Sequence, residues 1–324
     1  MEFPNLLHLL NNGDATFSIV PTKLPKKNRS TKINTVVLSL ALSHARVINL
    51  ILLVLGTSLN FLIILVIVCV RSARTSTNLY VISLACSNMI ILIEPLEEVL
   101  KWFFDVNMKL NMDYVCIISF DVSIITIVIL KFVQYIGIFR DQISFGHVLL
   151  KKYTTVKGIA LIWSSCIISL AISLHIYDYF EEDMPDIYIC ITIMFITMPL
   201  IISVCIDALI IYELKILKEM EGSWRMKELR HYIMLVVVTI AFILIRIPYR
   251  LARAINFLDP KASCCTDDKR EVLYFMAKMY PFVFSFIYIS LSNEFHEIIM
   301  TILKKGCRKC SKEIRTSSND NIIV

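Results

Sequence analysis

The chain has 324 residues, of which 57% are hydrophobic and 19% are charged, with a formal net charge of +6 and a mean hydropathy of +0.69. Soluble domains contain about 45–50% apolar and about 25% charged residues. The composition therefore excludes an ordinary soluble globular protein, and it indicates a chain that resides in a lipid bilayer.

Seven apolar segments are long enough to cross a membrane, which takes about 20 residues in a helix. In chain order they cover approximately residues 47–70, 79–101, 115–139, 156–177, 187–212, 232–257 and 272–291. The second and seventh are the weakest, because Glu94, Glu97 and Glu98 crowd the one and Lys278 interrupts the other. An open strand edge cannot face lipid, so the predicted fold is an all-α membrane protein, a bundle of seven transmembrane helices.

The distribution of basic residues predicts the orientation of the bundle. Lys and Arg gather in the loops after the first, third and fifth spans and in the C-terminal tail, which places these segments in the cytoplasm. The N-terminus is then extracellular, although residues 23–32 are themselves basic. Asn28 lies in an Asn-Arg-Ser glycosylation sequon, which agrees with that side. We expect a multi-pass protein of the plasma membrane.

The chain divides into four parts by composition. These are an extracellular segment at 1–45, the bundle at 46–292, a membrane-surface helix at 293–305 and a cytoplasmic tail at 306–324. The 293–305 segment has apolar residues at helical spacing beside Lys304 and Lys305, as an amphipathic eighth helix would. Cys307 and Cys310 follow it, and they are either palmitoylation sites or plain thiols.

Single landmark residues occur in order along the spans. They are Gly56 and Asn60 in "GTSLN", Asn88 in "NLYVISLACSN", Cys116, Arg140 in "IFRDQ", Trp163, Pro199, Pro248 and Tyr249 in "IRIPYR", and Tyr288 and Phe295 in "FSFIYISLSNEF". This series resembles the rhodopsin-like (class A) G-protein-coupled receptors, and the Pro-Tyr pair resembles their chemokine-receptor branch. Many other signature positions differ, as in the receptor homologues that betaherpesviruses carry, which would act in a host cell membrane.

The resemblance implies roles at both ends of the bundle. Cys116 and Cys190 would form the disulfide of the second outer loop. Arg140 and Tyr288 would take part in G-protein coupling, and Glu228 would pair with Arg140 to restrain it. The alternative for Arg140 and Glu228 is an interfacial arginine and a separate, solvated glutamate.

The resemblance also implies a core switch in mid-membrane, formed by Asn60, Asn88, Arg246, Pro248 and Tyr249. Arg246 stands where the family has a tryptophan, and Asn88 stands where the family has a sodium-binding aspartate. We expect the sodium site to be lost and the guanidinium of Arg246 to replace the cation. The alternative is an ion pair between Arg246 and a buried acid.

The outer face is expected to bind a ligand. Arg246, Arg250 and Arg253 recur at spacings of four and three, so they share one helix face. Arg250, Arg253 and Tyr274 are expected to line the outer cavity, with nearby carboxylates as counter-charges. The second outer loop contributes the acids Asp178, Glu181, Glu182 and Asp183. Their negative field would attract a basic protein, which agrees with a chemokine-like ligand.

The sequence thus predicts a receptor that passes an extracellular signal to a heterotrimeric G protein, with arrestin as a further partner of the phosphorylatable tail. A non-signalling scavenger of the same fold is one alternative, and a transporter or channel built on the intramembrane charges is another. The sequence contains no enzyme motif and no His/Cys metal spacing. We expect no enzymatic activity, cofactor, metal site or nucleic-acid partner.

Overall fold

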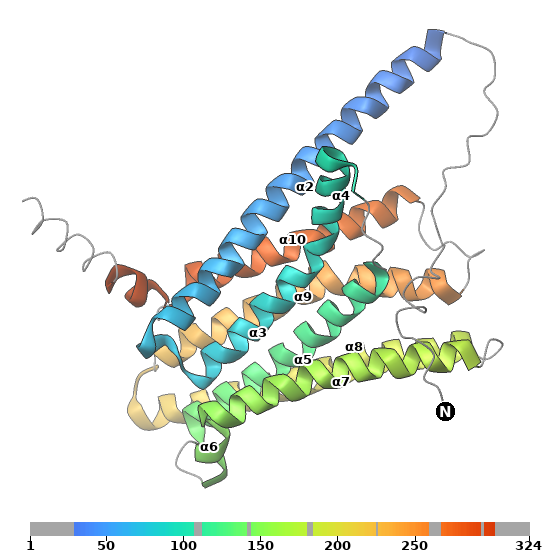
Figure 1. Cartoon of the computed structure of the whole chain (residues 1–324). Helices are drawn as coiled ribbons and strands as arrows, with labels where there is room; N and C mark the ends of the chain where they lie inside the picture. The colour runs from blue at the N-terminus through green and yellow to red at the C-terminus, as the bar shows by residue number, and fades with distance from the viewer. Residues whose placement is uncertain are drawn as a thin grey trace, which may run out of the picture.

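The computed structural model describes residues 29–106, 112–140, 144–179, 184–224, 226–258, 267–292 and 295–301. These residues form helices joined by short connections, and they contain no strand (Figure 1). Seven helical spans are long and apolar enough to cross a membrane. The predicted seven-helix fold is therefore confirmed, and the chain is a multi-pass membrane protein.

The seven spans are built from a series of helices. In chain order they are α2 (Arg29–Cys69), the 3-10 turn η1 (Arg71–Ala73), α3 (Ser76–Ile91), α4 (Ile93–Phe104), α5 (Met112–Phe139), α6 (Ser144–Leu149), α7 (Lys152–Tyr179), α8 (Met184–Glu221), α9 (Met226–Leu258) and α10 (Asp267–Leu291). The helices α4 and α6 lie at opposite ends of the bundle (Figure 1). We name these the α4 end and the α6 end.

The second span is two helices rather than one. α3 ends at Ile91 and α4 begins at Ile93, with Leu92 between them. Pro95 explains the break, because its ring clashes with the carbonyl of residue 91 and its nitrogen has no proton to donate. Gly56 of α2 accommodates the junction, since a Cβ at this position would come within 3.0 Å of Leu92 Cδ1.

Several helices extend beyond the predicted spans, and α2 and α8 do so the furthest. α2 begins at Arg29, inside the segment expected to precede the bundle, and α8 continues to Glu221, past the expected end at 212. Hydropathy identifies where a helix is apolar enough for lipid, whereas backbone hydrogen bonding continues into polar sequence that favours helix. The predicted limits therefore mark the membrane-spanning part of each helix and not the ends of the helix itself.

The centre of the bundle is α5. In its most apolar window 67% of residues are buried, against 22% for α8 and 17% for α7. Those two helices turn large apolar side chains outward, as lipid-facing helices do. Examples are Leu161, Ile168, Ile201, Val204 and Ile211.

Aromatic rings fill the space between α5, α9 and α10. Phe120 and Phe242 have ring centroids 5.1 Å apart, and Phe242 meets Tyr280 edge-on at 5.4 Å. Phe284 and Tyr288 continue this column toward the α6 end. Ring pairs of this kind add about 0.5–1.5 kcal/mol beyond the area that they bury.

Part of the predicted eighth helix is present. Residues 295–301 are helical, and the ring of Phe295 is buried against Tyr288 at 5.8 Å. The amide nitrogen of Phe295 donates to Ser292 Oγ, which starts this turn. Residues 302–305 lie outside the described residues, so the full extent of the amphipathic helix stays a prediction.

Two glycines at the α6 end provide a matched stability test. A Cβ at Gly146 of α6 would collide with the backbone carbonyl oxygen of Arg140, whereas one at Gly137 of α5 would make an ordinary contact of 3.6 Å with Leu150. We expect Gly146→Ala to lower the melting temperature of the detergent-purified protein, because the backbone after α5 must move. Gly137→Ala should change the unfolding free energy by no more than about 1 kcal/mol, and in the stabilising direction. Equal losses for the two variants would contradict this packing.

Candidate functional site

Arg246 is the most isolated charge in the described part of the bundle. Its side chain is 2% exposed, and its guanidinium lies 5.7–5.8 Å from the ring centroids of Phe120, Phe242 and Tyr280. One nitrogen, NH2, donates to Ser119 Oγ at 3.3 Å, while NH1 has no hydrogen-bond acceptor. No described carboxylate lies within salt-bridge distance of this residue. The three ring faces and the Ser119 hydroxyl therefore stabilise this charge at close range, and the Asp121 carboxylate acts on it from further away.

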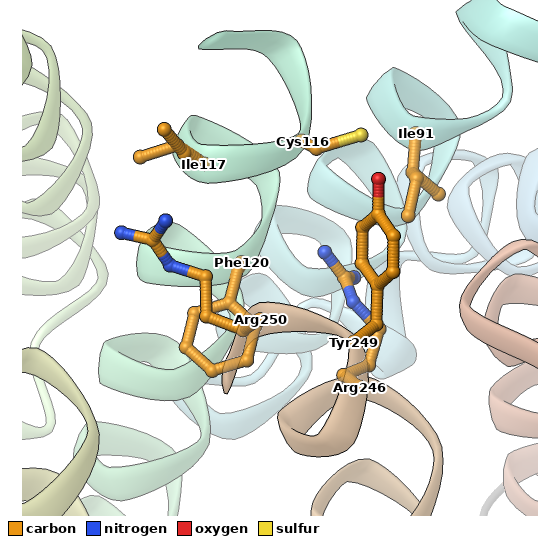
Figure 2. A pocket seen from close by; sticks show the side chains of 7 residues that line it. All are labelled: Ile91, Cys116, Ile117, Phe120, Arg246, Tyr249 and Arg250. Atoms are coloured by element: carbon orange, nitrogen blue, oxygen red, sulfur yellow. The ribbon is translucent and has the colours of Figure 1, made fainter. Parts of the chain in front are cut away.

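A small pocket opens beside this guanidinium at the α4 end of α5. It is lined by Ile91, Cys116, Ile117, Phe120, Arg246, Tyr249 and Arg250 (Figure 2). α9 contributes both arginines and Tyr249, and α5 supplies the opposite wall from Cys116 to Phe120. The lining thus combines two guanidinium groups with apolar and aromatic walls, and it contains no carboxylate.

Lys278 of α10 is the third cation at this end, and it is paired. Its ammonium lies 3.1 Å from Glu98 Oε1 and 3.9 Å from Glu94 Oε1, both on α4. Asn49 donates to the other oxygen of Glu98, and the ring of Tyr274 lies under the ammonium at 4.0 Å. The lysine that interrupts the seventh span is therefore neutralised by two of the acidic residues that crowd the second span.

Serines connect Arg246 to the interface between α3 and α5. Ser119 Oγ donates to the carbonyl oxygen of Ser87 at 2.6 Å, and Ser87 Oγ lies 2.9 Å from Ser123 Oγ. Asn88, next to Ser87, is fully buried, and neither atom of its amide has a hydrogen-bond partner. Arg246 thus reaches the polar groups beside Asn88 through Ser119. Replacement of a sodium ion by Arg246 stays a prediction, and the alternative pairing with an acid is absent among the described residues.

Lys131 and Asp207 form an ion pair in the middle of the membrane. Lys131 Nζ lies 2.7 Å from Asp207 Oδ2 and 2.9 Å from Ser203 Oγ, which joins α5 to α8. Lys131 is completely buried, whereas the side chain of Asp207 is 23% exposed. A lone charge at mid-membrane costs roughly 2.5–3.5 kcal/mol or more, so each residue depends on the other.

A second ion pair joins the same helices at the α6 end. Arg140, directly after α5, has its NH2 atom 2.6 Å from Glu213 Oε1 of α8. The expected pairing of Arg140 with Glu228 is therefore wrong. Glu228 lies instead in the first turn of α9, where a carboxylate is stabilised by the helix dipole.

The remaining core positions tie neighbouring helices together. Tyr288 donates its hydroxyl to Asn78 Oδ1 at 3.2 Å, which connects α10 to α3. Asn60 donates to the carbonyl oxygens of Gly56 at 2.8 Å and Pro281 at 3.1 Å, which connects α2 to α10. Pro248 lies inside α9 without ending it. These residues position the bundle, and no contact assigns them a switching role.

Cys116 is a buried free thiol whose sulfur lies 4.0 Å from Glu94 Oε2. This differs from the expected disulfide with Cys190, whose side chain is outside the described residues. The thiol fits its place in an apolar wall, because free cysteine behaves as a small hydrophobic residue.

The predicted ligand-facing residues are only partly described. Arg250 lines the pocket, and the ring of Tyr274 packs against Tyr249 at 5.1 Å. Asp178 and Arg253 belong to α7 and α9, but their side chains are not described. The following lie outside the described residues altogether: Asn28, Glu181, Glu182, Asp183, Cys307 and Cys310. Their predicted roles remain predictions.

The sequence reading missed two pairings. Lys131 and Asp207 lie within the predicted third and fifth spans, and neither was assigned a partner. Asp207 is the one acid in the apolar middle of the fifth span and Lys131 the one base in that of the third. Since both need neutralisation, their pairing was available from the sequence. Glu213 gave no such signal, because it lies beyond the expected end of its span.

Replacing both members of the mid-membrane pair should cost less than replacing one. Lys131→Met leaves the Asp207 carboxylate without its cation, and we expect it to lower the unfolding free energy by about 3–5 kcal/mol. Lys131→Met combined with Asp207→Leu should recover most of that loss, since two apolar side chains need no partner. Thermal unfolding of the single and double variants in detergent measures this coupling. Additive losses would show that the two residues act independently.

Comparisons with known proteins add no family. No protein-family model matches the chain, and no curated protein matches it in sequence. The seven apolar helices fit a membrane receptor, transporter or channel in general. The charged residues inside these helices are the features that can indicate a more specific function.

Proposed function

We propose that the chain is a cell-surface receptor of the rhodopsin-like G-protein-coupled class, resembling the chemokine receptors. It would bind an extracellular, basic, chemokine-like protein and activate a heterotrimeric G protein. The proposal combines the order of the landmark residues in the sequence with the placement of charges along α5.

The arrangement of α5 is the observation that carries this proposal. Cys116 lines the pocket at the α4 end, and Arg140 is paired with Glu213 at the α6 end. The two residues are 24 positions apart, which is about 36 Å along a helix at 1.5 Å per residue. One helix therefore extends from this pocket to a charged contact near the opposite membrane surface, as signal transfer along the bundle requires.

The family resemblance implied that Glu228 restrains Arg140. We assign this restraint to Glu213 instead, because Glu213 pairs with Arg140. This pair holds the end of α5 against α8, and half-exposed Arg140 is reachable from the aqueous side. A G protein that binds Arg140 must first separate it from Glu213. Breaking the pair is thus expected to favour the state that binds a G protein.

The basic loops support the orientation that this function needs. Basic residues at and near the α6 end include Arg71, Arg74, Lys151, Lys152 and Lys215. By the positive-inside rule, these residues support a cytoplasmic α6 end and a pocket on the outer side. At the pocket end, Glu97 of α4 provides an acidic group for a basic ligand, while Glu94 and Glu98 neutralise Lys278.

A transporter is the second candidate, and the Lys131–Asp207 pair favours it. Ionisable pairs buried within membrane-spanning helices occur along substrate and proton pathways. Asp207 retains one buried oxygen, Oδ1, without a hydrogen-bond partner, so the pair is incompletely satisfied.

Removing the restraint should raise basal activity, and removing the arginine should abolish it. We expect Glu213→Gln to increase agonist-free guanine-nucleotide exchange several-fold in membranes that contain the receptor and a panel of heterotrimeric G proteins. Arg140→Gln should eliminate exchange at equal surface expression. Glu219→Gln is the matched control, because Glu219 is exposed two turns further along α8. A wild-type chain and a Glu213→Gln variant that both bind chemokine without any exchange would identify a scavenger instead.

The transporter candidate predicts movement of solute through the purified protein. In proteoliposomes with an imposed proton gradient, the receptor proposal expects no protein-dependent dissipation of the gradient. Dissipation that disappears in the Lys131→Met, Asp207→Leu double variant would favour the transporter over the receptor.

A further inference from the structure

The pocket beside Arg246 is lined by two arginines and is too small for a peptide side chain. The free space at its centre has room for one small species. Both guanidinium groups of its lining come from α9, and Arg246 and Arg250 are 2% and 6% exposed. Any species that enters therefore meets buried cations in a site shielded from bulk water.

Arg246 lacks one acceptor for its protons. Its NH1 atom is buried and makes no hydrogen bond, and the single bond of NH2 to Ser119 is long, at 3.3 Å. The surrounding rings lie near the outer limit of about 6 Å for a cation–π contact, and a ring face does not replace an in-plane hydrogen-bond acceptor. NH1 of Arg246 is therefore a buried hydrogen-bond donor that lacks an acceptor.

The acids around the pocket are bonded to other groups or lie beyond ion-pair distance of Arg246. Glu98 is bonded to Lys278 and Asn49. Glu94 contacts Lys278 and the thiol of Cys116. Asp121 of α5 lies close enough to act electrostatically on both arginines, but it makes no ion pair with Arg246. The remaining acceptor for NH1 must come from outside the described residues.

We propose that this pocket binds one compact monovalent anion, of the size and charge of chloride, between the guanidinium of Arg246 and the wall formed by Cys116, Tyr249 and Arg250. A water molecule would satisfy the hydrogen bond of NH1 but would bring no negative charge, and Asp121 acts on Arg246 only from beyond ion-pair distance. A small anion satisfies both requirements in a site of low dielectric constant. Chloride is also abundant on the side of the membrane where the pocket is expected to open.

Bound chloride would act as a structural counter-ion for α9. It joins α9 to α5 at the level of the pocket, where the described side chains contribute no ion pair with Arg246. This role does not depend on receptor activity, since the counter-ion is needed in any seven-helix protein with this buried arginine.

The test is direct binding of radiolabelled chloride to the purified full-length protein in detergent. We expect saturable binding of one chloride per chain, displaced by bromide and not by gluconate, which is too large for the pocket. Exchanging chloride for gluconate should lower the melting temperature of the wild-type chain by a few degrees, because an ion that binds only the folded state stabilises it.

Variants then assign the bound ion to this pocket. Arg246→Gln should abolish saturable binding, and its melting temperature should no longer respond to chloride. Arg250→Gln should weaken binding at least tenfold. Arg71→Gln is the matched control, because Arg71 is exposed in the η1 turn at the opposite end of the molecule, and it should bind as the wild type does.

Two results would overturn the proposal. The first is the absence of saturable chloride binding by the wild-type chain, which decides the matter even if the arginine variants fail to fold. The second is equal loss of binding in Arg71→Gln and Arg246→Gln, which would attribute the ion to general surface charge.

Discussion

The bilayer interior supplies neither water nor counter-ions, and this constraint determines how the charged residues of the chain are arranged. Each charge within a span must be neutralised by other groups inside the bundle. Lys278 is neutralised by Glu98 and Glu94, and Lys131 by Asp207. Arg246 has rings and one serine in place of a carboxylate partner among the described residues. This is therefore the place where we propose a counter-ion from outside the chain.

The pairings converge on α5 because that helix occupies the centre. It contacts α3, α7, α8 and α9, and it contributes Ser119, Lys131 and the wall of the pocket. A central helix is shielded from lipid on most sides, so polar groups on it can be satisfied by neighbours. The peripheral helices α7 and α8 are instead apolar on their outer faces, and Asp207 of α8 turns inward toward Lys131.

The sequence predicted the fold well because membrane insertion leaves a strong local signal. Twenty apolar residues indicate a span whatever the tertiary packing, and all seven were located. Local chemistry also explains the break at Leu92, since Pro95 was visible, although the sequence reading treated that span as one helix. Pairings were harder to predict. Glu213 rather than Glu228 meets Arg140 because α8 continues as a helix past its apolar segment, and no periodicity shows which of two nearby acids a flexible arginine will reach.

The two ion pairs between α5 and α8 differ in how they can open. Arg140 and Glu213 are 43% and 19% exposed, so water can replace each partner as the pair separates. Lys131 is fully buried, and its separation from Asp207 would leave an ammonium group in hydrocarbon. Movement of α8 away from α5 is therefore expected to begin at the α6 end and to pivot near Lys131. The Lys131–Asp207 pair then limits how far α8 can move from α5, and the Arg140–Glu213 pair determines when this movement begins.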